Sequence, residues 1–305
     1  MKKKYRIISL FILQLLFFNI KTYDALSFEN SDNSNSYEIN MKRDLLSIAV
    51  SYKDYVSDVE KNGDKVYLVM KSGKKILYDD MRSKSEDEKL ERGTLKDMME
   101  QTYILGPIKS VQPKNFNPGR IRSYQLMAEV YGKSEGEIQK QIEYIGNNGF
   151  SKNNGAASSL KKVFKEINSS SVSDGRISAY VYPTSGGYNY RFVRGTGRLS
   201  AHAYGIAIDL KTNKNDYWKW SNPKDATKRI ASYPEKLIEI FESNNFIWGG
   251  KWGYFDIMHF EYRPEIIFKA KYFGDKCTDD VWYKGVNEED EIVKKYISII
   301  DEKLK

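Results

Sequence analysis

The stretch that decides the fold is S-A-H-A-Y-G-I-A-I-D, residues 200–209, and it has a partner in D-I-M-H-F-E, residues 256–261. The two segments contain both histidines of the 305-residue chain, His202 and His259. Each histidine has an aspartate nearby, seven residues after the first (Asp209) and three residues before the second. Imidazole nitrogen and carboxylate oxygen suit zinc, and a catalytic zinc site keeps three protein ligands and one open position. The pattern predicts that His202, Asp209 and His259 bind a metal ion.

The residues around Asp209 indicate how the first segment folds. Residues 206–208 are apolar and predict a short buried strand, with side chains alternating between its faces. Gly205 permits a close backbone approach where that strand begins. His202 would then lie on the preceding loop, and the chain must bend near Tyr204 for both ligands to reach one metal ion.

The second segment contains a carboxylate, Asp256, that is not one of the three predicted metal ligands. Asp256 precedes His259 by three residues, which puts the two on one face of a helical turn or at the two ends of a tight loop. Either arrangement holds a base close to a metal ligand. Spacing alone leaves open that both histidines only pack in the core, because the zinc-peptidase pattern H-E-x-x-H is absent.

The motifs also resemble those of a known family. The pattern S-x-H-x-x-G-x-A-x-D followed by D-x-x-H-F is similar to the VanY-like D-alanyl-D-alanine carboxypeptidases and related zinc peptidases of bacterial cell walls. The resemblance covers residues 177–262, and a weaker similarity is found at residues 118–122. Three neighbouring sequence segments are also similar to the family, namely Tyr190-Arg191, G-T-G-R-L at residues 195–199 and W-G-G-K-W at residues 248–252.

This resemblance implies roles for the four residues already singled out. It implies zinc as the cofactor, with His202, Asp209 and His259 as its ligands. The family's general base falls on Asp256. An aspartate at that position resembles the branch that includes L-alanyl-D-glutamate endopeptidases as well as carboxypeptidases, so the peptide bond that is cleaved stays open.

The resemblance further implies an arginine near the substrate carbonyl or carboxylate. Arg191 is the first candidate and Arg194 the second. Ser200 is expected to be a hydrogen-bond partner and not a nucleophile, since the chain has no third histidine to activate it. The implied function is metal-dependent hydrolysis of peptidoglycan stem peptides. The alternatives are a catalytically inactive cell-wall-binding protein that retains the metal site, and a structural protein without a metal.

The start of the chain predicts export. Three lysines at residues 2–4 and Arg6 precede an apolar run over residues 7–20, the pattern of a secretory signal. The run is short for a membrane span. No clean small-x-small cleavage site precedes residue 26, so an uncleaved N-terminal anchor, the only expected membrane contact, stays open. The expected location is secreted or associated with the bacterial cell wall or cell surface.

Composition limits the partners. The net charge is +8, and removing residues 1–25 takes away five Lys/Arg and one Asp and leaves about +4. A mildly basic protein suits an anionic cell wall and does not favour nucleic acid as a partner. Cys277 is the single cysteine, so the fold cannot depend on an intramolecular disulfide.

The predicted organisation has four parts. They are a signal peptide or anchor (1–25), an accessory region with a β-meander (26–115), the zinc peptidase domain (116–285) and a C-terminal helix (286–305). The meander has predicted strands at 56–59, 65–70 and 75–78, with Gly63 and Gly73 in its turns. It is either a wall-binding module or an accessory sheet packed on the catalytic domain.

The remaining pattern predicts an α+β fold, an antiparallel sheet with flanking helices. The resemblance implies the hedgehog-like architecture of the zinc DD-peptidases. Apolar periodicity predicts helices at 86–103, 121–131, 134–145, 158–167, 234–246 and 292–304. Strands are predicted at 177–182, 188–193 and 206–210.

Overall fold

The computed structural model describes residues 36–171, 174–193, 196–274 and 281–305. The chain divides into two compact units, Met1–Lys42 and Arg43–Lys305. Of the first unit, residues 36–42 are described, and they are helical. The expected signal or anchor and Cys277 lie outside the described residues.

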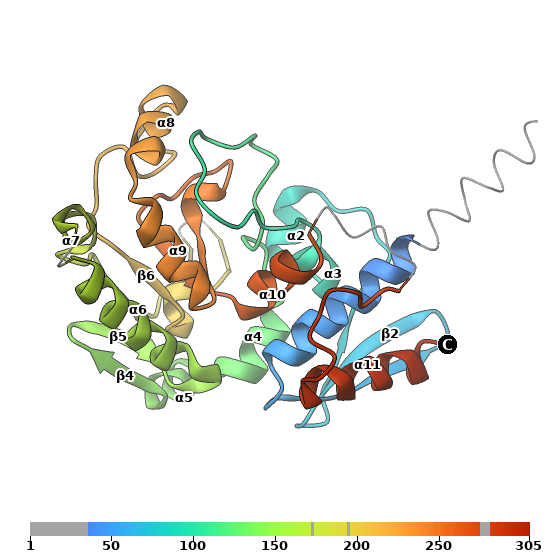
Figure 1. Ribbon diagram of the computed structural model, residues 1–305. Coiled ribbons are helices and arrows are strands. Elements are labelled where there is room, and N and C mark those ends of the chain that lie inside the picture. The colour runs from blue at the N-terminus through green and yellow to red at the C-terminus, as the bar shows by residue number, and fades with distance from the viewer. Residues whose placement is uncertain (1–35, 172–173, 194–195, 275–280) are drawn as a thin grey trace, which may run out of the picture. The chain divides into compact units, whose positions relative to one another are not determined.

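The β-meander forms as the sequence predicts. Strands β1 (Val56–Asn62), β2 (Lys65–Met70) and β3 (Lys75–Leu77) pair antiparallel in the order β1-β2-β3. Every second side chain of β2 is buried and the others are exposed or half-buried, as a sheet with one covered face requires. The C-terminal helix α11 (Glu291–Lys303) packs against β1, where the Tyr296 hydroxyl donates a 2.9 Å hydrogen bond to the Val56 carbonyl (Figure 1).

The helix predicted at 86–103 is two helices, α2 (Glu86–Arg92) and α3 (Leu95–Met99). The break has a local cause at Thr94, whose hydroxyl accepts a hydrogen bond from the Asp97 backbone while the Asp97 carboxylate accepts one from the Thr94 backbone. Such a capping box starts a new helix. The next predicted helix forms as α4 (Tyr124–Tyr131), three residues later than expected.

The prediction of a helix at 134–145 is wrong in its second half. Helix α5 covers Glu135–Lys140, and a β-hairpin follows, formed by β4 (Ile142–Ile145) and β5 (Asn148–Ser151). The turn contains Gly146 at φ +59°, a conformation that glycine adopts without strain. Helix α6 (Ala156–Ser171) then packs on this hairpin (Figure 1).

Two predicted strands are absent from the described residues. The segment expected as strand 177–182 is helix α7 (Gly175–Val181), because the Asp174 carboxylate accepts a hydrogen bond from the Arg176 backbone and caps it. Residues 188–193 run as an irregular segment with one isolated bridge, from Phe192 to Leu199. In these two short segments, the alternation of apolar and polar residues is compatible with a strand, a short capped helix or a loop, so it did not predict the structure correctly.

The sheet that carries the predicted site has three antiparallel strands in the order β6-β8-β7. They are β6 (Ala207–Asp209), β7 (Phe246–Trp248) and β8 (His259–Tyr262). Helix α9 (Glu235–Ser243) packs against β7. Helix α8 (Pro223–Ser232) precedes α9, and helix α10 (Pro264–Tyr272) follows β8. The sequence analysis predicted neither helix. Small antiparallel sheets mixed with helices agree with the predicted α+β class, and the hedgehog-like architecture stays a prediction.

Aromatic side chains hold this sheet to its helix. The rings of Phe241 on α9 and Phe260 on β8 stack with centroids 3.9 Å apart, and Phe246 meets Phe241 edge-on at 5.4 Å. All three are fully buried. Burial of each large apolar side chain contributes about 1.5–3 kcal/mol, so the strand with the second histidine has a rigid base.

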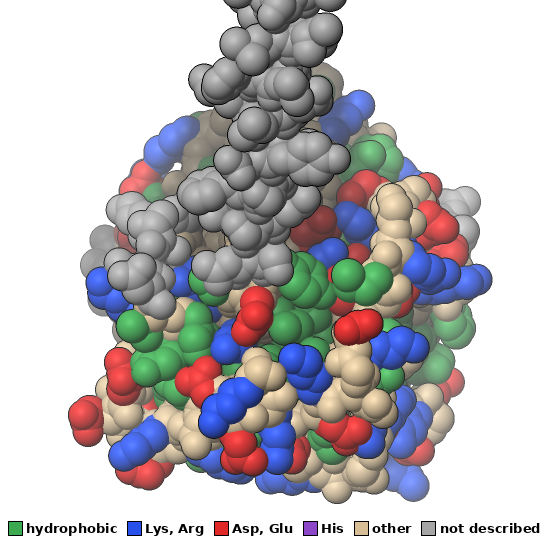
Figure 2. All heavy atoms as spheres, turned by 90° about the vertical axis from the view of Figure 1, so that its right-hand side faces the viewer, with side chains coloured by type: hydrophobic (Ala, Val, Ile, Leu, Met, Phe, Trp, Pro, Cys, Tyr) green, Lys and Arg blue, Asp and Glu red, His purple; other side chains and the backbone are tan. Residues whose placement is uncertain are grey.

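Two features bear on the partners of the protein, the hydrophobicity of its helices and the distribution of charge on its surface. Within the described ranges, none of the helices is both long and apolar enough to span a bilayer. Figure 2 shows one face on which basic and acidic side chains are interspersed, with apolar side chains between them. Charge is therefore spread over this face and not gathered into one patch.

Candidate metal centre

The loop before β6 positions His202. Residues Ala201–Tyr204 form one turn of 3-10 helix, η2, and the Ser200 hydroxyl accepts a 3.3 Å hydrogen bond from the His202 backbone. Gly205 then takes φ +66°, and a Cβ there would lie 2.5 Å from the Ile142 Cδ1. The chain therefore bends at Gly205 into the strand, as the sequence predicted.

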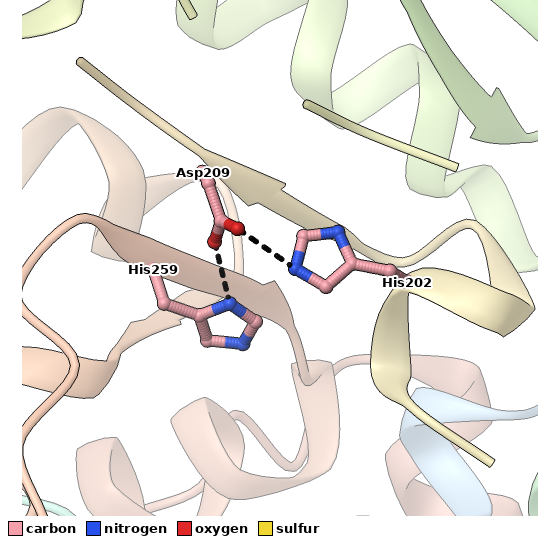
Figure 3. A group of neighbouring side chains, drawn as sticks. All are labelled: His202, Asp209 and His259. Carbon is pink, nitrogen blue, oxygen red and sulfur yellow. Dashed lines mark hydrogen bonds and ion pairs between the residues drawn. The ribbon is translucent and has the colours of Figure 1, made fainter. Parts of the chain in front are cut away.

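The sheet register brings the two other ligand candidates together. Asp209 ends β6 and pairs directly with His259, which begins β8. Asp209 Oδ1 lies 2.9 Å from His259 Nδ1, and Asp209 Oδ2 lies 3.3 Å from His202 Nε2 (Figure 3). One ligand atom from each residue lies within 4.8 Å of the others. These three side chains are called the metal cluster below.

The second nitrogen of each ring is also engaged. His202 Nδ1 lies 2.8 Å from the Gly187 carbonyl oxygen, which can only accept, so Nδ1 carries the hydrogen and Nε2 is left free. His259 Nε2 lies 3.7 Å from Glu261 Oε2, so its Nδ1 is left to face Asp209. Partners of this kind fix the tautomer of metal-binding histidines.

Glu261 is a site residue that the sequence analysis missed. It is fully buried, and Arg122 donates to both of its carboxylate oxygens, from Nε to Oε1 at 2.6 Å and from NH2 to Oε2. Burial alone would raise the pKa of Glu261, but Arg122, the contact with His259 and Arg263 lower it well below its usual range. Glu261 lies on the same face of β8 as His259, as the alternation of side chains along a strand predicts. Its pairing with Arg122, 139 residues away, cannot be predicted from a local sequence pattern.

The metal cluster is a charged hydrogen-bonded group. Burial alone would lower the pKa of His259, but its hydrogen bond to Asp209 and the nearby Glu261 carboxylate raise it to about 10. Burial would raise the pKa of Asp209, and the two histidines lower it below its usual range. Zinc binding must therefore displace a proton from His259, because a ligand nitrogen has to be neutral.

Asp256 lies in a tight loop, the second of the two predicted arrangements. Its carbonyl accepts a 3.1 Å hydrogen bond from the His259 backbone, and its own backbone donates to the Gly249 carbonyl at 2.9 Å. Its Oδ1 is buried and has no hydrogen-bond partner among the described residues. Burial raises the pKa of Asp256 to about 6, with Asp209 adding to the rise and His259 opposing it. A carboxylate of this kind suits a general base.

The arginine predicted to contact substrate is less defined. Arg191 is exposed, and its carbonyl accepts a 3.1 Å hydrogen bond from the Ser200 backbone, so its segment adjoins the loop of His202. Its side-chain role stays a prediction. The second candidate, Arg194, lies outside the described residues.

The donor set fits a zinc ion. Two imidazole nitrogens and one carboxylate are the ligand type and number of a catalytic zinc site, and each histidine has a partner on its other nitrogen. A buried carboxylate oxygen of Asp256, which has no hydrogen-bond partner among the described residues, is available to accept a proton.

Comparison with protein-family models confirms the family resemblance. Residues 194–262 match the family described as D-alanyl-D-alanine carboxypeptidase, which suggests a peptidase. The match covers less than a quarter of the chain and includes the metal cluster and Asp256. No curated protein and no solved structure matches the chain.

Proposed function

We propose that this protein is a zinc-dependent peptidase that hydrolyses peptidoglycan stem peptides outside the cell or at its surface. The observation that carries the proposal is that the three side chains of the metal cluster converge within 4.8 Å inside the segment that matches the carboxypeptidase family. The bond cleaved is either the D-alanyl-D-alanine bond, in a carboxypeptidase, or the L-alanyl-D-glutamate bond, in an endopeptidase.

The chain's own residues supply the rest of the mechanism. His202, Asp209 and His259 would hold the zinc ion, which when bound supplies a Lewis acid that polarises the scissile carbonyl and acidifies water. Asp256 takes a proton from the attacking water while the water oxygen forms a bond to the carbonyl carbon. Asp256 then delivers that proton to the amine nitrogen as the C–N bond breaks. Arg191 is assigned to the developing oxyanion or to a substrate carboxylate.

The test is digestion of peptidoglycan by the purified protein, with and without a chelator, followed by mass analysis of the released fragments. Chelator-sensitive release of D-alanine is the carboxypeptidase result, and cleavage after L-alanine is the endopeptidase result. Asp256→Asn should slow release by about 100- to 10,000-fold, whereas Asp64→Asn, at an exposed turn position, should leave it unchanged. A wild-type protein that binds about one zinc per chain and releases nothing would instead be a catalytically inactive cell-wall-binding protein.

A further inference from the structure

A cluster of aromatic side chains lies on and beside the segment that precedes helix α8. Trp220 is 58% exposed, and the ring of Tyr217 meets it edge-on with the centroids 5.2 Å apart. Tyr217 also lies 6.0 Å from the ring of Trp218, which in turn meets Tyr254 edge-on at 4.9 Å. These four residues are called the aromatic strip below. Exposed apolar side chains that gather in one place mark a binding surface, whereas single ones are ordinary.

The aromatic strip is joined to the loop of the proposed base. Tyr217 and Asp256 form an isolated antiparallel bridge, and backbone hydrogen bonds of 3.0 and 2.7 Å flank this pair, one on each side. In a pair of this kind, which exchanges no hydrogen bonds itself, the Cα atoms lie about 4.5 Å apart and the two side chains lie on the same face. The Tyr217 ring therefore lies on the same face as the Asp256 carboxylate, next to the proposed reaction.

The segment that carries the exposed ring is held at both ends. Before the strip, the fully buried Asp216 accepts a 2.7 Å hydrogen bond from Arg229 Nε. After it, the Trp220 backbone donates a 2.8 Å hydrogen bond to the Tyr217 carbonyl, and the Asn222 side chain caps helix α8. An ordered turn thus displays the Trp220 ring, which limits the conformational entropy lost when a ligand binds.

The exposed charge around the aromatic strip is positive. Residues 211–228 contain five lysines, all exposed, and two aspartates. Asp216 is paired with Arg229, and Asp225 is half-buried in the first turn of α8, 4.0 Å from Lys228. This surface therefore combines aromatic rings with cationic groups, which suits an anionic ligand that has flat apolar faces.

The proposed substrate contains a component of this kind. Peptidoglycan consists of sugar chains that carry the stem peptides. Alanine and glutamate, the residues at the candidate scissile bonds, have no ring that could stack on a tryptophan. A pyranose ring has a face of C–H groups that can pack on an aromatic ring, and the attached peptides supply the carboxylates.

We propose that Trp220 and Tyr217 bind a sugar ring of the peptidoglycan chain, so that the protein acts on stem peptides that are still attached to their glycan. The inference rests on the proposed function. The face of the sugar packs against the exposed Trp220 ring, and the neighbouring lysines attract the carboxylates of the attached peptide. The bridge between Tyr217 and Asp256 keeps this sugar site next to the base.

The test compares two substrates of the zinc-loaded full chain, a stem peptide linked to its disaccharide and the same peptide without the sugar. The wild-type kcat/KM should be about tenfold higher for the sugar-linked peptide, mainly through a lower KM. Trp220→Ala should reduce the ratio of the two kcat/KM values to about one. Trp220→Phe, which keeps an aromatic ring, should retain most of the ratio.

The matched control is Tyr283→Ala, which removes a half-buried ring from the loop before α11 and should leave the ratio unchanged. Thermal melting shows which variants fold, and Trp220→Phe decides the matter if Trp220→Ala does not fold. Equal wild-type kcat/KM values on the two substrates would overturn the inference and leave the peptidase function standing. Equal losses on both substrates in Trp220→Ala would assign the aromatic strip to the peptide and also overturn it.

A wild-type protein that cleaves neither substrate would refute the proposed function instead. Calorimetric titration with peptidoglycan chains freed of their peptides then decides the sugar site. Binding that is lost in Trp220→Ala and kept in Tyr283→Ala supports it. No binding by the wild-type protein, or equal binding by Trp220→Ala, refutes it.

Discussion

At the scale of single residues, the metal cluster depends on two groups outside it, one from the backbone and one from a side chain. The Gly187 carbonyl and Glu261 each engage the outer nitrogen of one histidine. This leaves His202 Nε2 and His259 Nδ1 facing Asp209, as a shared ion requires.

Replacing Glu261 by glutamine tests this orientation. Glu261→Gln keeps the shape of the side chain and removes the negative charge 3.7 Å from His259 Nε2, so zinc affinity should fall by about 10- to 100-fold. Competition against a chromophoric chelator measures the change. Glu143→Gln, on the half-buried edge of β4, is the control and should bind zinc normally. Unchanged affinity in a folded Glu261→Gln protein would contradict the assigned role.

The pKa of Asp256 predicts an acid limb in the pH–rate profile. The base acts when ionised, so activity should rise as the pH rises through the pKa of Asp256. Burial raises this pKa to about 6, and a bound zinc ion would lower it. The acid limb should therefore lie at or below about pH 6. Asp256→Asn should lower kcat by about 100- to 10,000-fold while zinc stays bound. Full activity in that variant would show that another group is the base.

The raised pKa of His259 predicts proton release on zinc binding. With a pKa of about 10 in the ion-free protein, His259 is protonated at pH 7 and must lose its proton to become a ligand. Zinc affinity should therefore increase as pH rises from 6 towards the pKa of about 10. Calorimetry in buffers of different ionisation enthalpy should count about one proton released per zinc at pH 7. A buffer-independent heat would argue against this protonation state.

At the scale of elements, the bend at Gly205 positions the metal loop. Gly205→Ala meets a φ of +66° and places a Cβ 2.5 Å from the Ile142 Cδ1 and 3.0 Å from the Ser151 backbone nitrogen. The expected loss is about 1–3 kcal/mol of unfolding free energy, together with weaker zinc binding, because His202 must shift. Chemical denaturation and zinc titration measure the two effects.

Gly63→Ala provides a matched control for that substitution. Gly63 has a similar φ of +58° in the β1–β2 turn, but a Cβ there meets nothing within 4 Å. The control therefore carries the backbone strain alone, about 1 kcal/mol, and should leave zinc affinity unchanged. Equal effects of the two substitutions would show that the close packing at Gly205 is unimportant.

Local sequence signals predicted the elements whose cause is local. The meander followed from alternation and two glycine turns, and the bend at Gly205 followed from the motif around His202. The helix α7 was missed because one capping aspartate, Asp174, outweighed a pattern that also suits a strand. The hairpin β4–β5 was missed because its apolar residues continue the pattern of the helix before it.

At the scale of the whole molecule, the residues that sequence could not find are those joined by long-range pairing. Arg122 and Glu261 meet only because the fold brings the segment before α4 next to strand β8. The same buried network continues through Arg263 and Glu265 to the hydroxyl of Tyr52, which donates a 2.7 Å hydrogen bond to Glu265. A residue near the start of the Arg43–Lys305 unit thus contributes to the support of His259, although no spacing rule connects them.

The measurement that tests the central claim most directly is anomalous diffraction at the zinc edge from crystals of the zinc-loaded protein. The account predicts one strong peak bound by His202 Nε2, a carboxylate oxygen of Asp209 and His259 Nδ1, with zinc–nitrogen distances of about 2.0–2.1 Å. The peak should disappear in crystals of His202→Ala. A peak at other residues, or none in crystals soaked with zinc, would contradict the metal centre and with it the proposed peptidase.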